Sequence, residues 1–521
     1  MNEKSLQGWV TTLSMAPPCL ENNTADADRL LSAIKSTLKT PRVDIDLPLL
    51  RVLADRLRKY NYRVDCILFQ DRHRHILIDI TDAKEKSTVA GLAVDLGTSR
   101  VVLRLLDLVS GRILSESAFD NPQIAIGPDI LTRVHHADSE AGTRELHHLI
   151  LNGLNDRIAD ICKISRIPPE RIYFLSIAGN TAMTHLFLGL NPRWMIREPY
   201  IPVVNTPGVF CAGELGISIH PAARIFAFPN VGSYFGGDLI AGILFAGLHR
   251  AEEPALLLDV GTNAEVVLGD KNWLIACAGA AGPALEGGVT RMGMMAGPGV
   301  IDRVTICPDT GSFTVHTIDE APPRGICGSG VIDLAAQMFL SGLLDIQGRL
   351  VVDRCGNRLK ETDGMRYLVL VPAKASATGE DLVISQADFD SLIRSKAAMY
   401  TILRTLTGTV GVELDSLSTV FVAGTFGSFI NPASAVAIGM LPDLPLDRYH
   451  SIGNSSLGGA TMLLTTPGCL SEIDRIRDRV TYLELNVNQE FMNRFSAAKF
   501  LPHTDRGRFP SVKIFGSPDL T

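Results

Sequence analysis

The chain has 521 residues, of which 46% are hydrophobic, 20% charged and 6% aromatic, and its net charge is −7. It is several times longer than a typical domain of about 150 residues and has an ordinary globular composition, so a small disulfide scaffold and a largely disordered chain are excluded. The negative charge argues against a nucleic-acid partner. No uninterrupted apolar run is long enough for a membrane span and no signal peptide is visible, so we expect a cytoplasmic protein with no membrane partner.

The nine cysteines are widely spaced and form no C-x-x-C motif. This spacing excludes zinc-ribbon and ferredoxin motifs and favours scattered, mostly buried thiols in a reducing compartment. We therefore expect no iron–sulfur cluster in this chain. The cysteines stand at positions 19, 66, 162, 211, 277, 307, 327, 355 and 469.

Residues 1–86 predict a small α+β module. Apolar residues at helical spacing predict one helix around 30–38 and another around 49–57, with Asp46 as a possible N-cap and Pro48 in the first turn. Two short strand patterns follow, at 64–69 and 76–80. The rest of the chain is expected to form two lobes, 87–254 and 255–521.

One sequence pattern occurs twice and opens each lobe. Four apolar residues lead into Asp95-Leu-Gly97-Thr98-Ser99 in the first copy and into Asp259-Val-Gly261-Thr262-Asn263 in the second, and a Val-rich run follows each. The pattern predicts a buried strand, a glycine turn and a returning strand. A glycine turn lets backbone N–H groups approach a phosphate, and a carboxylate at a strand end can hold Mg²⁺ through water. Two such hairpins therefore predict two lobes that clamp one polyphosphate.

Three further elements accompany the twin hairpins. Asp238, after Gly236-Gly237, opens a short apolar helix and is either a third carboxylate of the site or a plain N-cap. The run 325–330 contains Gly328-Ser329-Gly330 before a helix predicted over 331–344, and it predicts either a ribose or anion site or a tight packing turn. A strand ends at Ala423 in a Gly-rich turn, Gly424-Thr425-Phe426-Gly427-Ser428, followed by a short Ala-rich helix after Asn431-Pro432. The capping box Ser385-x-x-Asp388 predicts the start of a long structural helix.

These elements, in this order, resemble the superfamily of acetate and sugar kinases, heat-shock chaperone ATPases and actin. The chain is most similar to one branch, the ATP-dependent reductive activators of corrinoid proteins, over nearly its whole length. The similar strings are 91–102, Asn121-Pro122-Gln123, 178–186, 281–287, 325–334 and the tail segments 500–505 and 509–512.

The resemblance implies an α/β, two-lobed actin-like (ribonuclease H-like) ATPase fold behind the small N-terminal module. It implies Mg-ATP hydrolysis coupled to reduction of a corrinoid methyl-carrier protein from Co(II) to Co(I), in a homodimer that serves a methyltransferase system. Asp95, Asp238 and Asp259 are expected to act in hydrolysis, with Mg²⁺ at Asp95 and Asp259. Phosphate contacts are expected from Gly97, Thr98, Ser99, Gly261, Thr262 and Asn263, with Asn180 and Thr181 near the γ-phosphate. Ribose and base contacts are expected from Gly328, Ser329, Gly330, Gly424, Thr425, Phe426 and Gly427, and Glu286 either reaches the sugar or forms a surface salt bridge.

The family typically carries an iron–sulfur domain before the linker or cluster motifs at the C-terminus, and this sequence shows neither pattern. We therefore expect electrons from a separate low-potential donor such as a ferredoxin. Two alternatives remain open at this point: a small-molecule kinase of the same superfamily, and an ATP-gated binding or chaperone module without a redox role.

Overall fold

The computed structural model describes residues 9–71, 74–85, 87–261, 263–280, 292–307, 311–362, 364–483 and 489–513. The chain divides into two compact units, 1–245 with 455–478 and 246–454 with 479–521. Each unit contains one six-stranded sheet. Residues 455–478 thus pack with the first unit, whereas the second lobe was expected to contain all of 255–521.

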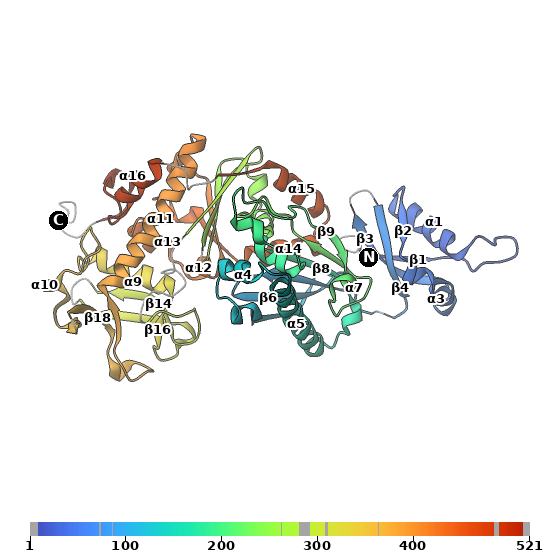
Figure 1. Cartoon of the computed structure of the whole chain (residues 1–521), viewed down its shortest axis with the longest axis horizontal. Coiled ribbons are helices and arrows are strands. Elements are labelled where there is room, and N and C mark those ends of the chain that lie inside the picture. The colour runs from blue at the N-terminus through green and yellow to red at the C-terminus, as the bar shows by residue number, and fades with distance from the viewer. Residues whose placement is uncertain are drawn as a thin grey trace. The chain divides into compact units, whose positions relative to one another are not determined.

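The N-terminal module is a four-stranded sheet in the order β1-β3-β4-β2, with α1 and α3 on one face (Figure 1). Its strands are β1 (Val10–Ser14), β2 (Val43–Ile45), β3 (Arg63–Asp71) and β4 (Arg74–Asp82), and its helices are α1 (Asp26–Leu38), α2 (Leu47–Leu50) and α3 (Leu53–Lys59). The second predicted helix is broken in two at Val52, whose φ of −116° and ψ of 0° lie outside the helical region. Asp46 precedes α2 but makes no side-chain capping bond.

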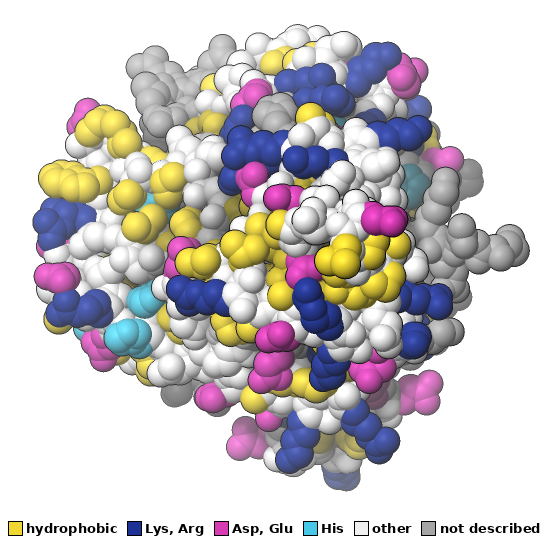
Figure 2. All heavy atoms as spheres, turned by 90° about the vertical axis from the view of Figure 1, so that its right-hand side faces the viewer, with side chains coloured by type: hydrophobic (Ala, Val, Ile, Leu, Met, Phe, Trp, Pro, Cys, Tyr) yellow, Lys and Arg dark blue, Asp and Glu magenta, His cyan; other side chains and the backbone are white. Residues whose placement is uncertain are grey.

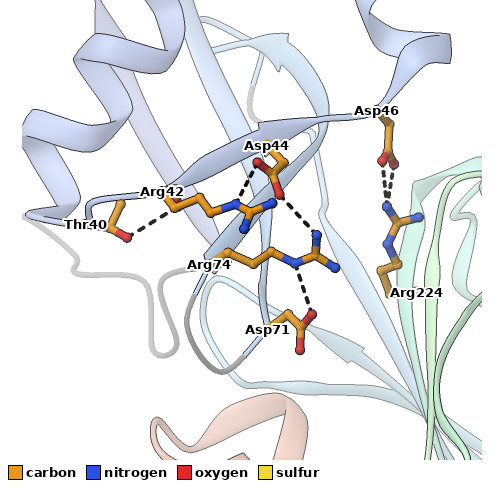
Figure 3. Close-up of polar contacts among 7 residues, drawn as sticks. All are labelled: Thr40, Arg42, Asp44, Asp46, Asp71, Arg74 and Arg224. Atoms are coloured by element: carbon orange, nitrogen blue, oxygen red, sulfur yellow. Dashed lines mark hydrogen bonds and ion pairs between the residues drawn. The ribbon is translucent and has the colours of Figure 1, made fainter.

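Asp46 instead pairs with an arginine of the neighbouring sheet. Its two carboxylate oxygens accept from Nη2 of Arg224, on β10, over 2.7 and 2.6 Å (Figure 3). Trp9 adds an indole N–H bond of 2.9 Å to the carbonyl of Leu464 and packs its ring 4.6 Å from that of Phe174. The module is therefore joined to the rest of the first unit by a largely buried ion pair and an aromatic contact. Around the module, acidic and basic side chains are interspersed on the surface (Figure 2).

The sheet of the first unit has the order β7-β6-β5-β8-β10-β9. Central strand β5 pairs antiparallel with β6 and parallel with β8, so Asp95 stands opposite Ala178 at the carboxyl end of β5. Alternate residues face opposite sides of a strand: Leu92 packs in the core that includes α5, and a Cβ at Gly91 would lie 3.2 Å from Leu464 of α14. The strands are β5 (Ala90–Leu96), β6 (Arg100–Asp107), β7 (Ile113–Asp120), β8 (Ile172–Gly179), β9 (Gly208–Cys211) and β10 (Arg224–Ala227). The helices are α4 (Ile130–His136), α5 (Glu140–Ser165), α6 (Thr181–Phe187), α7 (Ala212–Leu215), α8 (Gly237–Ala246), α14 (Ser455–Thr465) and α15 (Cys469–Arg479).

The second unit repeats this arrangement with the order β21-β20-β11-β12-β13-β22. Central strand β11 pairs antiparallel with β12 and parallel with β20, as β5 does with β6 and β8. The two Asp-x-Gly strings therefore occupy equivalent places in two sheets of like topology, and the two-lobed α/β prediction is confirmed. The strands are β11 (Ala255–Val260), β12 (Asn263–Gly269), β13 (Leu274–Ala280), β20 (Thr419–Ala423), β21 (Tyr449–Gly453) and β22 (Val480–Tyr482).

Two three-stranded sheets, β15-β14-β16 and β17-β18-β19, complete the second unit. The predicted capping box is confirmed, because Ser385 and Asp388 exchange side-chain and backbone hydrogen bonds at the start of α11. The strands are β14 (Val300–Ile306), β15 (Phe313–Thr317), β16 (Gly325–Ile326), β17 (Leu359–Thr362), β18 (Met365–Val371) and β19 (Leu382–Ser385). The helices are α9 (Gly328–Leu340), α10 (Val352–Cys355), α11 (Gln386–Val410), α12 (Gly424–Phe429), α13 (Pro432–Ala437) and α16 (Gln489–Ala498).

Across the described part of the chain, no helix combines the length and the apolar character that a membrane crossing requires.

Candidate nucleotide-binding residues

The carboxyl ends of β5 and β8 bring together three of the predicted residues in the first unit. Asn180 follows β8 directly, and its side-chain Nδ2 donates to the hydroxyl of Thr98 over 3.0 Å. Its Oδ1 accepts from the backbone N–H of Met183 over 2.9 Å, which makes Asn180 the N-cap of α6. Asp95 is on the same edge, in register with the last residues of β8. Strand carboxyl ends are where α/β proteins commonly bind ligands.

Asp238 joins this group through an unusually close backbone approach. A Cβ placed at Gly236 would lie 2.4 Å from the Cα of Asn180 and 2.6 Å from Oδ1 of Asp238, so a side chain at position 236 would force these groups apart. Asp238 stands inside the first turn of α8 rather than before it, and its Oδ1 accepts from the N–H of Leu239 over 2.9 Å. Asp238 therefore lies near Asn180 and within the first turn of the helix, and its role in the site remains a prediction.

The loop after β5 is a tight turn held by a residue to which the sequence analysis assigned no role. A Cβ at Gly97 would meet the carbonyl oxygen of Arg100 at 2.2 Å, so the turn needs glycine. Asn121 makes two hydrogen bonds to the loop. Its Nδ2 donates to the carbonyl of Gly97 over 2.9 Å, and its backbone N–H donates to the carbonyl of Ser99 over 2.8 Å. The side chain of Ser99 is exposed. In the sequence, Asn121 was marked only by the family-like string Asn121-Pro122-Gln123, which carried no structural role.

Thr181 and His185 hold α6, the helix capped by Asn180, in place through hydrogen bonds. The Thr181 hydroxyl is buried and donates to the carbonyl of Gly232 over 3.0 Å. The fully buried imidazole of His185 contacts the Thr181 carbonyl through Nδ1 at 2.7 Å, and its Nε2 accepts from the N–H of Val203 over 3.1 Å. Burial lowers the pKa of His185, which keeps the ring neutral and its Nε2 an acceptor. Thr181 is therefore linked to the segment before Asp238 by its hydroxyl.

In the second unit, Asp259 and Gly424 meet at the carboxyl ends of β11 and β20. The strands are parallel, with Asp259 opposite Ala423. Gly424 has φ +80°, and a Cβ there would lie 3.1 Å from Oδ1 of Asp259 and 3.3 Å from the carbonyl of Val260. The carboxylate therefore lies against the backbone at the start of α12. The expected Gly-rich turn is in fact this short helix, because Gly424 alone makes the turn and the residues after it continue as α12.

The Gly-rich start of α9 is explained by packing. The helix begins at Gly328 rather than at 331, and Ser329 is buried with its Oγ 3.1 Å from Sγ of Cys327. A Cβ at Gly330 would lie 2.3 Å from the carbonyl of Ile301, so glycine lets α9 approach β14. Contacts from this turn to ribose remain a prediction.

Some predicted residues fall outside what the structure describes. Thr262 and Glu286 lie outside the described residues, and for Asn263, Thr425 and Phe426 only the backbone is described. Gly261 ends the described run after β11, and Gly427 packs so closely that a Cβ would lie 2.5 Å from the carbonyl of Val422. The residue types present nevertheless fit Mg-ATP, since Mg²⁺ takes carboxylate oxygens and phosphates lie against glycine-rich backbone.

The repeated sheet topology, with a carboxylate near the carboxyl end of each central strand, defines a two-lobed α/β protein of the actin-like class. Three family models match the chain in succession: the RACo linker region over residues 9–87, the RACo middle region over 90–251, and the C-terminal domain of RACo, the ASKHA domain, over 253–513. The chain belongs to the RACo family.

Named relatives agree with this assignment. The chain is 30% identical over 485 residues to the corrinoid activation enzyme RamQ of Eubacterium limosum, covering 91% of this chain and 79% of that protein. It is 23% identical to the [Co(II) methylated amine-specific corrinoid protein] reductase of Methanosarcina barkeri, covering 77% and 75%. A solved structure described as a reductive activator for corrinoid, iron-sulfur protein matches with a TM-score of 0.89 and 36% identity, over 98% of this chain and 82% of that one.

Proposed function

We propose that this protein is an ATP-dependent reductive activator that returns the cobalt of a corrinoid methyl-carrier protein from Co(II) to Co(I). The observation that carries the proposal is that three RACo family models match the chain in succession, over residues 9–87, 90–251 and 253–513. The TM-score of 0.89 to a reductive activator supports it. In this reaction one electron leaves a separate donor and enters the corrinoid cobalt, which changes from Co(II) to Co(I).

Hydrolysis of Mg-ATP would be carried by three carboxylates. Asp95 and Asp238 in the first unit and Asp259 in the second would position Mg²⁺ and the attacking water, because phosphoryl transfer depends mainly on positioning and charge neutralisation. Magnesium would be held by Asp95 and Asp259. The twin glycine turns would offer N–H groups to the phosphates, and the turn at Gly424 would bind adenosine. The close placement of Asn180 beside Thr98 and of Gly424 beside Asp259 supports these roles.

ATP is needed in this proposal because the electron moves uphill. A gap of ~0.2 V for one electron corresponds to about 5 kcal/mol. Hydrolysis can supply that free energy only if the nucleotide binds two lobe arrangements with different affinities. A two-lobed ATPase of this class can change its affinity for a partner protein as its lobes open and close during ATP hydrolysis.

The electron is proposed to come from a separate iron–sulfur protein, such as a ferredoxin. Iron–sulfur ligation requires thiolates. Burial raises the pKa of Cys162 to about 11 and that of Cys277 to about 12, and neither cysteine belongs to a C-x-x-C pair. Nine free cysteines suit a reducing compartment. We accordingly propose that the protein works in the cytoplasm, as a homodimer whose mass light scattering would show.

The test follows the visible spectrum of a Co(II) corrinoid protein mixed with this chain, Mg-ATP and titanium(III) citrate or reduced ferredoxin. Co(I) is expected to accumulate only when Mg-ATP is present. Asp259→Ala should abolish both hydrolysis and reduction, whereas Asp353→Ala, which changes an exposed aspartate of α10, should behave as wild type. If ATP is hydrolysed and cobalt is never reduced, the activator function is wrong.

A further inference from the structure

A fully buried arginine is connected by hydrogen bonds to the loop that follows β5. Arg133, on α4, has 0% relative exposure. Its Nε donates to the carbonyl of Gly127 over 2.8 Å, and its Nη1 donates to Oε1 of Gln123 over 3.2 Å and lies 3.3 Å from Sδ of Met183. Its Nη2 is buried without a hydrogen-bond partner among the described residues. The groups bonded to the guanidinium are a carbonyl, an amide and a thioether, all of them neutral.

A buried cation bonded to neutral groups is costly, because desolvation is not repaid by an opposite charge. Burial lowers the pKa of Arg133 to about 10 although the carboxylate of Asp129 acts in the other direction. The guanidinium therefore stays charged at neutral pH. An apolar side chain of similar volume would fill the same space without that cost. Packing alone does not explain an arginine at this position.

Hydrogen bonds lead from Arg133 to the main chain of the candidate phosphate loop. Gln123, which accepts from Arg133, donates its backbone N–H to Oδ1 of Asn121 over 3.0 Å. Asn121 in turn holds the carbonyls of Gly97 and Ser99. Asn121 thus accounts for two hydrogen bonds to the main chain of the loop, and these bonds restrain its conformation.

A second path leads from Arg133 to the side chain of the loop. Met183, whose sulfur contacts the guanidinium, donates its N–H to Asn180, and Asn180 donates to the hydroxyl of Thr98. Both paths run within the first unit. Arg133 thus connects with the loop at Gly97 and Ser99 on one side and at Thr98 on the other.

We propose that Arg133 is a positioning residue for the polyphosphate: it fixes the Gly97–Ser99 loop through Gln123 and Asn121, and its buried charge favours a triphosphate over an uncharged nucleoside. The inference rests on the proposed nucleotide function. A charge in the protein interior is screened less than a surface charge, so it acts on a bound anion beyond hydrogen-bond range. The affinity for adenosine, which lacks phosphates, should not depend on the charge of Arg133.

The experiment is a calorimetric titration of the full chain with Mg-ATP and, separately, with adenosine. Arg133→Met should weaken Mg-ATP binding roughly 10- to 100-fold and leave adenosine binding unchanged, whereas Arg133→Lys, which keeps the charge, should recover part of the loss. Arg144→Met removes an arginine of α5 that is exposed and paired with Glu140, and it should change neither affinity. Thermal unfolding of each variant accompanies the titrations.

The outcomes separate this inference from the proposed function. A wild-type chain that binds no Mg-ATP overturns both. A wild type that binds, together with an Arg133→Met chain whose ratio of Mg-ATP to adenosine affinity is unchanged, overturns only the role of Arg133. If Arg133→Met does not fold, Asn121→Ala takes its place, because it frees the Gly97 carbonyl and leaves the guanidinium intact. A selective loss of Mg-ATP affinity in that variant supports the inference, and an equal loss for both ligands overturns it.

Discussion

Asn180 donates its side-chain amide to the hydroxyl of Thr98 over 3.0 Å and with its other side-chain atom caps α6. One residue therefore fixes both the start of a helix and the orientation of a hydroxyl in the loop after β5. The donor and the acceptor functions of the amide can be separated by substitution.

Asn180→Asp keeps an oxygen for the cap, removes the N–H offered to Thr98 and adds a negative charge. The free energy of unfolding should change by less than about 1 kcal/mol, whereas Mg-ATP affinity should fall about tenfold, a difference of about 1.4 kcal/mol. Urea unfolding and calorimetry measure the two. Ser139→Ala is the matched control: it removes the N-cap of α5, should cost about 1 kcal/mol and should leave affinity unchanged. Wild-type affinity in Asn180→Asp would contradict the role of this bond.

Gly424→Ala tests the contact with Asp259. Alanine at φ +80° costs about 1–2 kcal/mol, and its Cβ would also press on Oδ1 of Asp259 at 3.1 Å. Gly411→Ala carries the same kind of strain at φ +67°, but its Cβ would meet no atom of the described residues within 4 Å. Both variants should lose similar stability in thermal unfolding, and only Gly424→Ala should lose ATPase activity. Equal activity in the two variants would show that the contact with Asp259 is unimportant.

The ion pair between Asp46 and Arg224 should hold the N-terminal module in place. Their side chains are only 22% and 8% exposed, so Asp46→Ala leaves a buried guanidinium without its carboxylate and should cost about 3 kcal/mol. Asp44 is the control, since its partners Arg42 and Arg74 are 63% and 40% exposed (Figure 3). Asp44→Ala should cost at most about 1 kcal/mol. Urea unfolding of both variants measures the difference, and similar losses would count against the buried pair.

His503 should make stability depend on pH. Burial, with help from Lys396 and Arg508, lowers the pKa of His503 from 6.5 to about 4, and its Nδ1 accepts from the N–H of Asp505 over 2.9 Å. Between pH 4 and 6.5 the unfolded state therefore binds more protons than the folded state, so the free energy of unfolding rises with pH through this window and this contribution is lost on acidification.

His503→Gln should flatten that rise when urea unfolding is measured at several pH values between 4 and 7. His450→Gln, at an exposed histidine of β21, should keep the wild-type pH dependence. A His503→Gln chain with an unchanged slope would mean that His503 is not the group responsible.

Local patterns in the sequence predicted the two lobes because their signals lie within a few residues. The Asp-x-Gly strings fix a strand, a turn and a returning strand by alternation and by the need for glycine, as the 2.2 Å approach at Gly97 demonstrates. The capping box at Ser385 is likewise a contact between residues three apart. Each of these features forms from neighbouring residues and needs no knowledge of distant ones.

Other features were decided by the tertiary structure, since they depend on partners far along the chain. Asp46 has the position of an N-cap, but the guanidinium of Arg224 takes its carboxylate. The segment 455–478 packs with the first unit although it follows most of the second. Arg133 is an ordinary helix residue in the sequence, and only its burial against Gln123 and Met183 gives it a proposed role. Side-chain periodicity predicts which face of an element is buried, but not which distant residue will meet it there.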